Sequence, residues 1–117
     1  MEDRDVARRM PVWMAFSELF LDTELTEAGY RSIRRTLLRS GYGSRELRDI
    51  LEREVAPVLH ANLLSGAGVW DGWDEAELRA SILARLHAPG RPRRALLQRW
   101  LLRRFLEKEW ARIDPET

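Results

Sequence analysis

The stretch PVWMAFSELF, residues 11–20, decides the fold because its apolar residues recur at steps of three and four. Those residues are Val12, Trp13, Phe16, Leu19 and Phe20. This spacing places them on one wide face of an α-helix, whereas a half-buried strand would alternate at every second residue. Because Pro11 is tolerated in the first turn of a helix, we expect the first helix to begin near Pro11, after a frayed turn from Val6.

The same helical period recurs along the rest of the chain, and no strong alternating pattern competes with it. Further helices are predicted over about residues 27–40, 44–59, 74–87 and 93–113. Since Pro57 lacks a backbone N–H and clashes with the preceding turn, we expect a break or kink at Val55–Ala56. The predicted fold class is all-α, an irregular bundle of about five helices joined by short links.

Residue types at the ends of these segments support the predicted boundaries. Thr26 and Ser44 are good N-caps, and Asp74 followed by Glu77 resembles a capping box. Gly41 stands where a left-handed residue ends the second helix. The residues expected to face inward on the later helices are Tyr30, Ile33, Leu37, Leu47, Ile50, Leu51, Val55, Val58, Leu59, Leu78, Ile82, Leu86, Leu97, Leu101, Phe105, Leu106, Trp110 and Ile113.

Length and composition indicate one domain spanning residues 1–117, with 44% hydrophobic residues and enough apolar surface for a core of its own. The formal net charge is only +1, so the overall charge balance is not that of a polyanion-binding protein. The chain has no cysteine, which excludes disulfides and thiolate metal sites. The N-terminus lacks the apolar core of a signal peptide, and no apolar run is long enough to span a bilayer, so we expect a cytoplasmic protein.

Residues for catalysis or metal binding are in short supply. The two histidines, His60 and His87, fall near predicted helix ends, and the sequence places no nucleophile and carboxylate beside either. Asp22 and Glu24 could hold a hard cation, but their simpler role is to follow one helix and approach the N-cap of the next. The glycines of GAGVWDG, residues 66–72, follow no strand and bring no lysine for a phosphate. We therefore expect a non-enzymatic protein without metal or cofactor.

Charged and aromatic residues gather in two places that we expect to bind a partner. An acidic patch follows the first helix and comprises Glu18, Asp22, Glu24 and Glu27. A basic side of the last helix comprises Arg93, Arg94, Arg104, Lys108 and Arg112, with the loop residues Trp70 and Trp73 as aromatic anchors. Since two cations in a first turn oppose the helix dipole, Arg93 and Arg94 hint at an acidic partner.

Nucleic acid is a less favoured partner. The second and third predicted helices have the lengths of a helix–turn–helix, and the third carries Arg45, Arg48 and Arg53. The same helix also carries four carboxylates, which would repel phosphate. The basic side of the last helix is a second possible contact, partly neutralised by Glu107 and Glu109.

Two stretches are similar to a family of small bacterial proteins of unknown function. They are PVWMAFSELFLDTEL, residues 11–25, and EVAPVLHANLLSGAGVWDGWDE, residues 54–75, and the resemblance covers about residues 10–86. It leaves out the tail from Pro89. The resemblance implies a bacterial source and a short helical protein, and it supplies no catalytic residue.

By elimination, the sequence favours a bacterial protein-interaction module, most concretely an immunity protein or antitoxin that inhibits a toxin by direct binding. Such a protein needs complementary charge and a few aromatic anchors rather than a reaction centre. The alternative is a small nucleic-acid-binding regulator that uses the helix–turn–helix-like element or the basic last helix. A homodimer is compatible with either hypothesis, and no membrane partner is expected.

Overall fold

The structure is a computed structural model that describes residues 2–20, 25–59, 73–87 and 95–115. Within these ranges the chain is helical and has no strand, which confirms the predicted all-α class. The elements are α1 (Asp3–Ser17), the 3₁₀ turn η1 (Glu18–Phe20), α2 (Glu27–Arg39), α3 (Ser44–Ile50), the π-helical turn η2 (Leu51–Val55), α5 (Glu75–His87) and α6 (Ala95–Ile113). No helix in the described part of the chain combines the length and apolar character that crossing a membrane requires.

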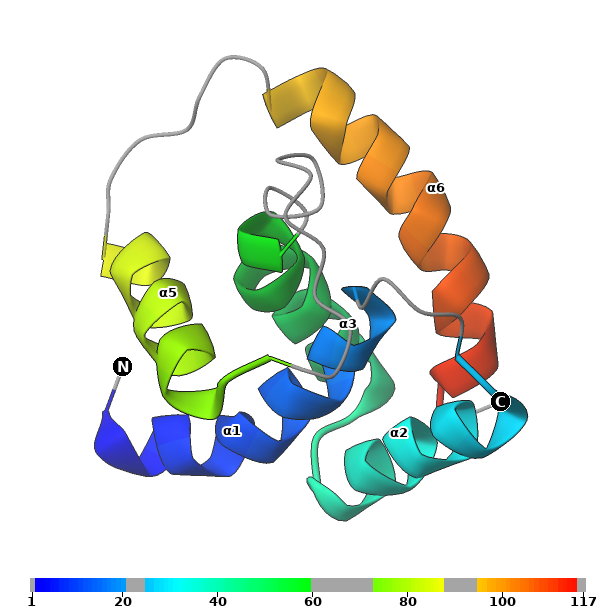
Figure 1. Ribbon diagram of the computed structural model, residues 1–117, viewed down its shortest axis with the longest axis horizontal. Coiled ribbons are helices and arrows are strands. Elements are labelled where there is room, and N and C mark those ends of the chain that lie inside the picture. Colours follow the sequence, from blue (N-terminus) through cyan, green and yellow to red (C-terminus); the bar gives the residue numbers. More distant parts are fainter. Residues whose placement is uncertain (1, 21–24, 60–72, 88–94, 116–117) are drawn as a thin grey trace.

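The helices run in different directions around α1, so the bundle is irregular, as predicted (Figure 1). In Figure 1 helix α1 lies between α5 on one side and α2 on the other, and the C-terminal half of α6 approaches α2. The molecule measures 35 × 32 × 26 Å. Helix α1 contacts α2, η2 and α5, which makes it the central element.

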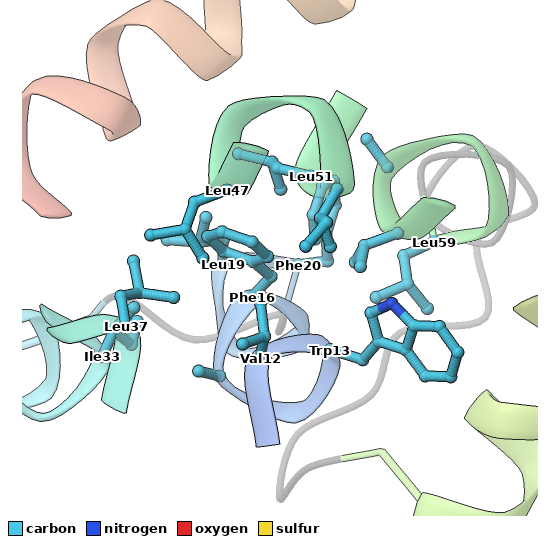
Figure 2. Close-up of a cluster of buried hydrophobic side chains, with 14 of the residues drawn as sticks. Val12, Trp13, Phe16, Leu19, Phe20, Ile33, Leu37, Leu47, Leu51 and Leu59 are labelled. Atoms are coloured by element: carbon cyan, nitrogen blue, oxygen red, sulfur yellow. The ribbon is translucent and has the colours of Figure 1, made fainter. Parts of the chain in front are cut away.

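The apolar face predicted for residues 11–20 forms the middle of the core (Figure 2). Val12, Trp13, Phe16 and Phe20 are completely buried. The predicted faces of the next two helices meet this cluster, and their buried residues are Ile33, Leu37, Leu47, Ile50, Leu51 and Val55. Since burial of each large apolar side chain is worth about 1.5–3 kcal/mol, this cluster is the main source of stability.

Three predicted helix ends are confirmed by their hydrogen bonds and backbone angles. The Thr26 hydroxyl accepts from the Gly29 N–H at 3.1 Å, and the Asp74 carboxylate accepts from the Glu77 N–H at 2.9 Å. Gly41 follows α2 with φ +80°, the left-handed conformation with which many helices end.

The predicted start of the first helix is wrong. Helix α1 begins at Asp3, and Pro11 lies in its interior. Asp3 and Asp5 in the first turn interact favourably with the helix dipole, and Val6 is buried in the core. Electrostatic interaction and apolar packing therefore both stabilise the first turns of α1. Pro11 is exposed, so the backbone hydrogen bond that proline cannot donate is lost on the solvent-facing side of the helix.

The predicted N-cap of the third helix is also wrong. Gly43 is the N-cap, and the Glu46 carboxylate accepts from its N–H at 3.4 Å. Ser44 is the first helical residue, and its hydroxyl instead donates to Asp114 Oδ1 at 2.8 Å. That contact spans most of the chain and ties the start of α3 to the end of α6, so the local pattern around Ser44 could not reveal it.

The disturbance expected before Pro57 is present, but it takes the form of a widened turn rather than an end. Over Leu51–Val55 the helix becomes a π-helix, and the Ala56 N–H donates to Leu51 O, five residues back. The wider turn makes room for the proline ring, and the chain stays helical through residues 56–59. Leu59 therefore still reaches the core.

The apolar face predicted for α5 is correct at Leu78 and Ile82 and wrong at Leu86. Leu78 and Ile82 are buried, whereas Leu86 is 41% exposed. Leu83, the residue after Ile82, packs partly against the core instead. Helix α5 is thus rotated so that Leu83, rather than Leu86, approaches the other helices.

The inner face predicted for α6 is confirmed where its side chains are described. Leu106 and Ile113 are buried. Trp110 is half-buried, and its ring lies 6.3 Å from that of Phe16, centroid to centroid. The remaining predicted core residues of this helix, Leu97, Leu101 and Phe105, lie outside the described side chains.

A polar network joins the π-helical turn to α1. Glu54 is only 11% exposed, and its two oxygens accept from Trp13 Nε1 at 2.8 Å and from Arg9 Nη1 at 2.9 Å. Arg9 also donates to the Tyr42 hydroxyl at 3.4 Å. Because buried polar groups are costly when left without partners, this network fixes how η2 sits on α1.

We predict that Glu54→Ala lowers the free energy of unfolding by about 2–4 kcal/mol, because it leaves the Trp13 indole N–H and the Arg9 guanidinium without their shared acceptor. Urea denaturation measures the loss. Glu52→Ala is the matched control, since Glu52 pairs with Arg48 in a more exposed i,i+4 contact, and it should cost less than about 0.5 kcal/mol. Equal costs for the two variants would contradict the structural role of Glu54.

We predict that Gly41→Ala costs about 1–2 kcal/mol, because an L residue is strained at φ +80° and its Cβ would lie 3.3 Å from Arg8 Nη2. Gly43→Ser is the control, because Gly43 has ordinary extended backbone angles and serine is a better N-cap than glycine. Thermal unfolding of the two variants should show destabilisation for the first and no loss for the second. A stable Gly41→Ala variant would rule out the left-handed helix end.

Candidate functional site

A groove of about 430 Å³ lies between α1 and α2 and is bordered by Trp73. Its apolar floor consists of Met14 and Ala15 of α1 and Ile33 of α2. The described residues that line it are Pro11, Met14, Ala15, Ser17, Glu18, Ser32, Ile33, Thr36 and Trp73. Glu18 and Trp73, which the sequence placed in two different patches, thus border the same groove.

Trp73 is held at the groove by a hydrogen bond to the end of α1. Its indole Nε1 donates to the carbonyl oxygen of Ser17 at 2.9 Å. A carbonyl oxygen can accept two hydrogen bonds, so Ser17 O can receive the indole N–H at the point where α1 passes into the 3₁₀ turn. The side chain is half-buried and packs against the core. The indole is therefore fixed in place, and part of it remains at the surface.

Glu18 follows Ser17 directly and is half-buried. Burial raises the pKa of its carboxyl group above the ordinary value of 4.5, because the groove disfavours the charged form. No ion pair to Glu18 is found within the part of the chain that the structure describes. A carboxylate that loses hydration without gaining a cation is a local cost to folding, which can mark a binding position.

Two of the hydroxyls that line the groove, those of Ser17 and Thr36, donate to carbonyls of their own helices. The Ser17 hydroxyl donates to Met14 O, and the Thr36 hydroxyl donates to Ser32 O at 3.2 Å. Among the lining residues that the structure describes, Glu18 is the one with an ionisable side chain. An apolar floor with one carboxylate and one indole suits the binding of a protruding side chain better than proton transfer between two groups.

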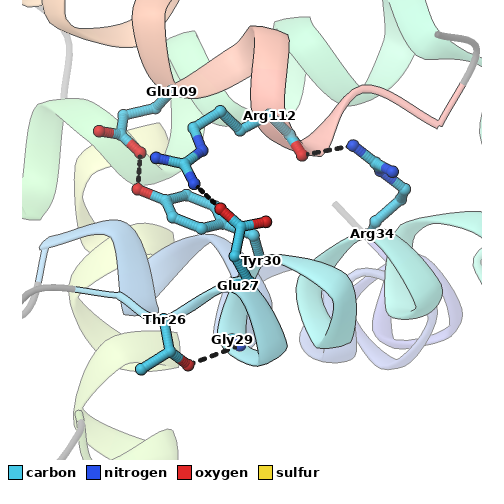
Figure 3. Close-up of polar contacts among 7 residues, drawn as sticks. All are labelled: Thr26, Glu27, Gly29, Tyr30, Arg34, Glu109 and Arg112. Carbon is cyan, nitrogen blue, oxygen red and sulfur yellow. Dashed lines mark hydrogen bonds and ion pairs between the residues drawn. The ribbon is translucent and has the colours of Figure 1, made fainter.

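Two residues predicted for opposite patches meet each other (Figure 3). Glu27 of the acidic patch forms an ion pair with Arg112 of the basic side of α6. The Arg112 guanidinium also lies over the Tyr30 ring, 4.0 Å from its centroid, and the Tyr30 hydroxyl donates to Glu109 Oε2 at 2.7 Å. These contacts join α2 to α6, so Glu27 and Arg112 have a structural role that the sequence did not indicate.

Two further residues predicted to bind a partner, Arg104 and Lys108, are described by the structure and do not line the groove. Arg104 and Lys108 are exposed on α6. Trp73 borders the same groove as Glu18, whereas the sequence pattern predicts it beside the basic side of α6. Across the described ranges no three histidine or acidic side chains come together as a metal site would require. The predicted residues that lie outside the described ranges are Asp22, Glu24, Trp70, Arg93 and Arg94.

One of the three arginines on which the helix–turn–helix alternative depends makes contacts within the fold. Arg48 pairs with Glu52 at 2.8 Å, and its guanidinium lies 5.5 Å from the centroid of the Trp110 ring. Helix α3 is also short and continues directly into the π-helical turn. These contacts favour a role for Arg48 in packing over contact with phosphate.

Sequence reasoning missed the floor and the α2 wall of the groove. The sequence pattern places Ile33 only on the buried face of its helix, and Ser32 and Thr36 carry no signal at all. One clue was available, because Pro11 and Met14 are apolar residues that fall outside the stripe predicted for the first helix. Apolar residues on the second side of a helix indicate a second surface to cover.

A protein-family model described as a domain of unknown function (DUF7079) matches residues 7–116. The match extends through α6. It therefore reaches beyond about residues 10–86, the region that is similar to small bacterial proteins of unknown function. No curated protein and no solved structure matches the chain.

We predict that Glu18→Gln stabilises the protein slightly at pH 7 and has no effect at low pH. A carboxyl whose pKa is raised on folding contributes full stability below its unfolded pKa and loses it as pH rises through the folded pKa. Because the group is partly solvated, the gain at pH 7 should stay within about 0.5 kcal/mol. Urea denaturation at pH 3.5 and 7 measures it, and a variant that is less stable only at pH 7 would contradict the burial cost.

Proposed function

We propose that this chain, which belongs to the DUF7079 family, is a non-catalytic protein-interaction module that inhibits a toxin by direct binding. In this proposal it is a bacterial, cytoplasmic immunity protein or antitoxin. Its partner inserts a side chain into the groove between α1 and α2, and the bound protein blocks the partner by covering its surface.

The observation that carries this proposal is the half-buried Glu18 beside a fixed indole and an apolar floor. A lysine or arginine from a partner would restore the interaction that the carboxylate loses on burial, while its aliphatic stem packs on Met14 and Trp73. Glu18 is already partly desolvated in the folded chain. The free-energy cost of removing its remaining water when the complex forms is therefore smaller. Such a site gives both affinity and selectivity for a cation.

The fixed position of Trp73 supports inhibition by occlusion. A tryptophan at an interface contributes most when it is rigid and sits at the centre of the contact, because little side-chain freedom is then lost on binding. The Trp73–Ser17 hydrogen bond supplies that rigidity without any partner. The groove therefore has the form of a prepared binding surface.

The proposal predicts that the chain protects cells against the toxin encoded beside it, and that Glu18→Arg abolishes this protection. Co-expression of the neighbouring reading frame with each variant measures growth. Calorimetry on the purified pair should show at least a tenfold loss of affinity for Glu18→Arg, about 1.4 kcal/mol, since a like charge would then face the incoming cation.

Glu107→Arg is the matched control, because Glu107 is exposed on α6 and the charge change is identical. It should protect as well as the unmodified chain and bind within about twofold. The absence of any protection by the unmodified chain would contradict the proposed function. Equal binding by the two variants would instead exclude the groove as the contact surface.

A further inference from the structure

A second cavity, of about 570 Å³, lies between the N-terminal half of α1 and the start of α5. Its lining residues are Asp3, Val6, Ala7, Met10, Pro11, Met14, Glu75 and Arg79. Pro11 and Met14 line this cavity and the first groove alike. The groove beside Trp73 and this cavity, the two hollows of α1, therefore open on the same strip of the helix and meet at these two residues.

The strip follows one line along the helix. Its members are Asp3, Ala7, Pro11, Met14 and Glu18. They are separated by steps of four, four, three and four residues, the spacing of neighbours on one helical face. At 1.5 Å per residue the strip is roughly 22 Å long, or about four turns. Its length is that of a short helix laid along α1.

The chemistry of the strip is apolar in the middle and acidic at both ends. The middle is formed by Ala7, Pro11 and Met14, and Met10 borders it. Asp3 and Glu75 stand at one end and Glu18 at the other. Among the described residues that line the two hollows, Arg79 is the one cation. A ligand that matches this pattern needs an apolar stripe with a positive charge near each end.

We propose that the two hollows form one continuous groove that binds an amphipathic helix of the partner protein, with a lysine or arginine near each end of its apolar stripe. This inference rests on the proposed function and names the binding element of the partner. A helix presents its anchors along one face at the same three- and four-residue steps as α1. The two methionines adapt their shape to such a ligand more readily than branched residues would.

A second copy of the chain fits the groove less well. In a symmetric dimer built on this surface the same strip would face itself, and carboxylates would oppose carboxylates at the ends. Like charges placed opposite each other disfavour association. Charge complementarity therefore points to a basic partner helix rather than to self-association.

Methyl NMR tests the inference directly, because Met10 and Met14 are two of the three methionines in the chain. The full chain carries ¹³C-labelled methionine methyl groups. The probe is a synthetic helical peptide of about 18 residues with a leucine stripe and lysines about fifteen positions apart. A second peptide carries glutamates at the same positions. The lysine peptide should shift both methyl signals, with at least a tenfold lower Kd than the glutamate peptide.

Asp3→Lys isolates the far end of the groove. It should weaken binding of the lysine peptide at least threefold and reduce the difference between the two peptides, whereas Glu107→Lys on α6 should change neither. Asp3→Asn serves in the same way if the lysine variant unfolds. If Glu18→Arg impairs protection while Asp3→Lys changes nothing, the first hollow alone is the site and this inference fails, although the proposed function stands.

Two further outcomes overturn the inference. Peptide binding that leaves the Met10 and Met14 methyl signals unshifted would place the peptide helix on another surface. The absence of binding at about 1 mM lysine peptide would show that the groove does not bind a helix of this pattern. Methyl shifts that depend on protein concentration without any peptide would identify a second copy of the chain as the occupant.

Discussion

The burial of one face of α1 is the constraint on which the rest of the structure depends. Val12, Trp13 and Phe16 are completely buried, and α2, η2 and α5 all pack against this helix. A helix covered on one side still presents its remaining surface, and here α2 and α5 border what remains. The groove is thus a consequence of the same packing that builds the core.

Polar contacts over long sequence separations then fix the positions of the surrounding helices. Glu54 holds the π-helical turn on α1, and Ser44 holds α3 to the end of α6. Arg34 donates to Arg112 O at 2.7 Å, and so stabilises a carbonyl at the C-terminus of α6. Apolar packing alone tolerates sliding and rotation of helices, whereas these directional bonds specify one arrangement.

The features that could be predicted from the sequence are local, and most of those that were missed depend on distant segments; the start of α1 at Asp3 and the N-cap at Gly43 are local exceptions. The cap at Thr26 and the left-handed Gly41 follow from neighbouring residues, and so do the buried faces of α1 and α2. The contact of Ser44 with Asp114, the rotation that exposes part of α5 and the ion pair between α2 and α6 all depend on segments far away in the chain. Glu18 and Trp73 could each be singled out, but only the packing of α1 shows that they border one groove.

The proposed binding site depends on Glu18 being a carboxylate that a cation of the partner stabilises. The most direct measurement is an NMR titration of the Glu18 side-chain carboxyl in the free protein and with the lysine peptide bound. We predict a pKa above the ordinary value in the free chain, and a lower pKa in the complex because a positive charge then stabilises the carboxylate. An ordinary pKa that binding leaves unchanged would contradict this role of Glu18.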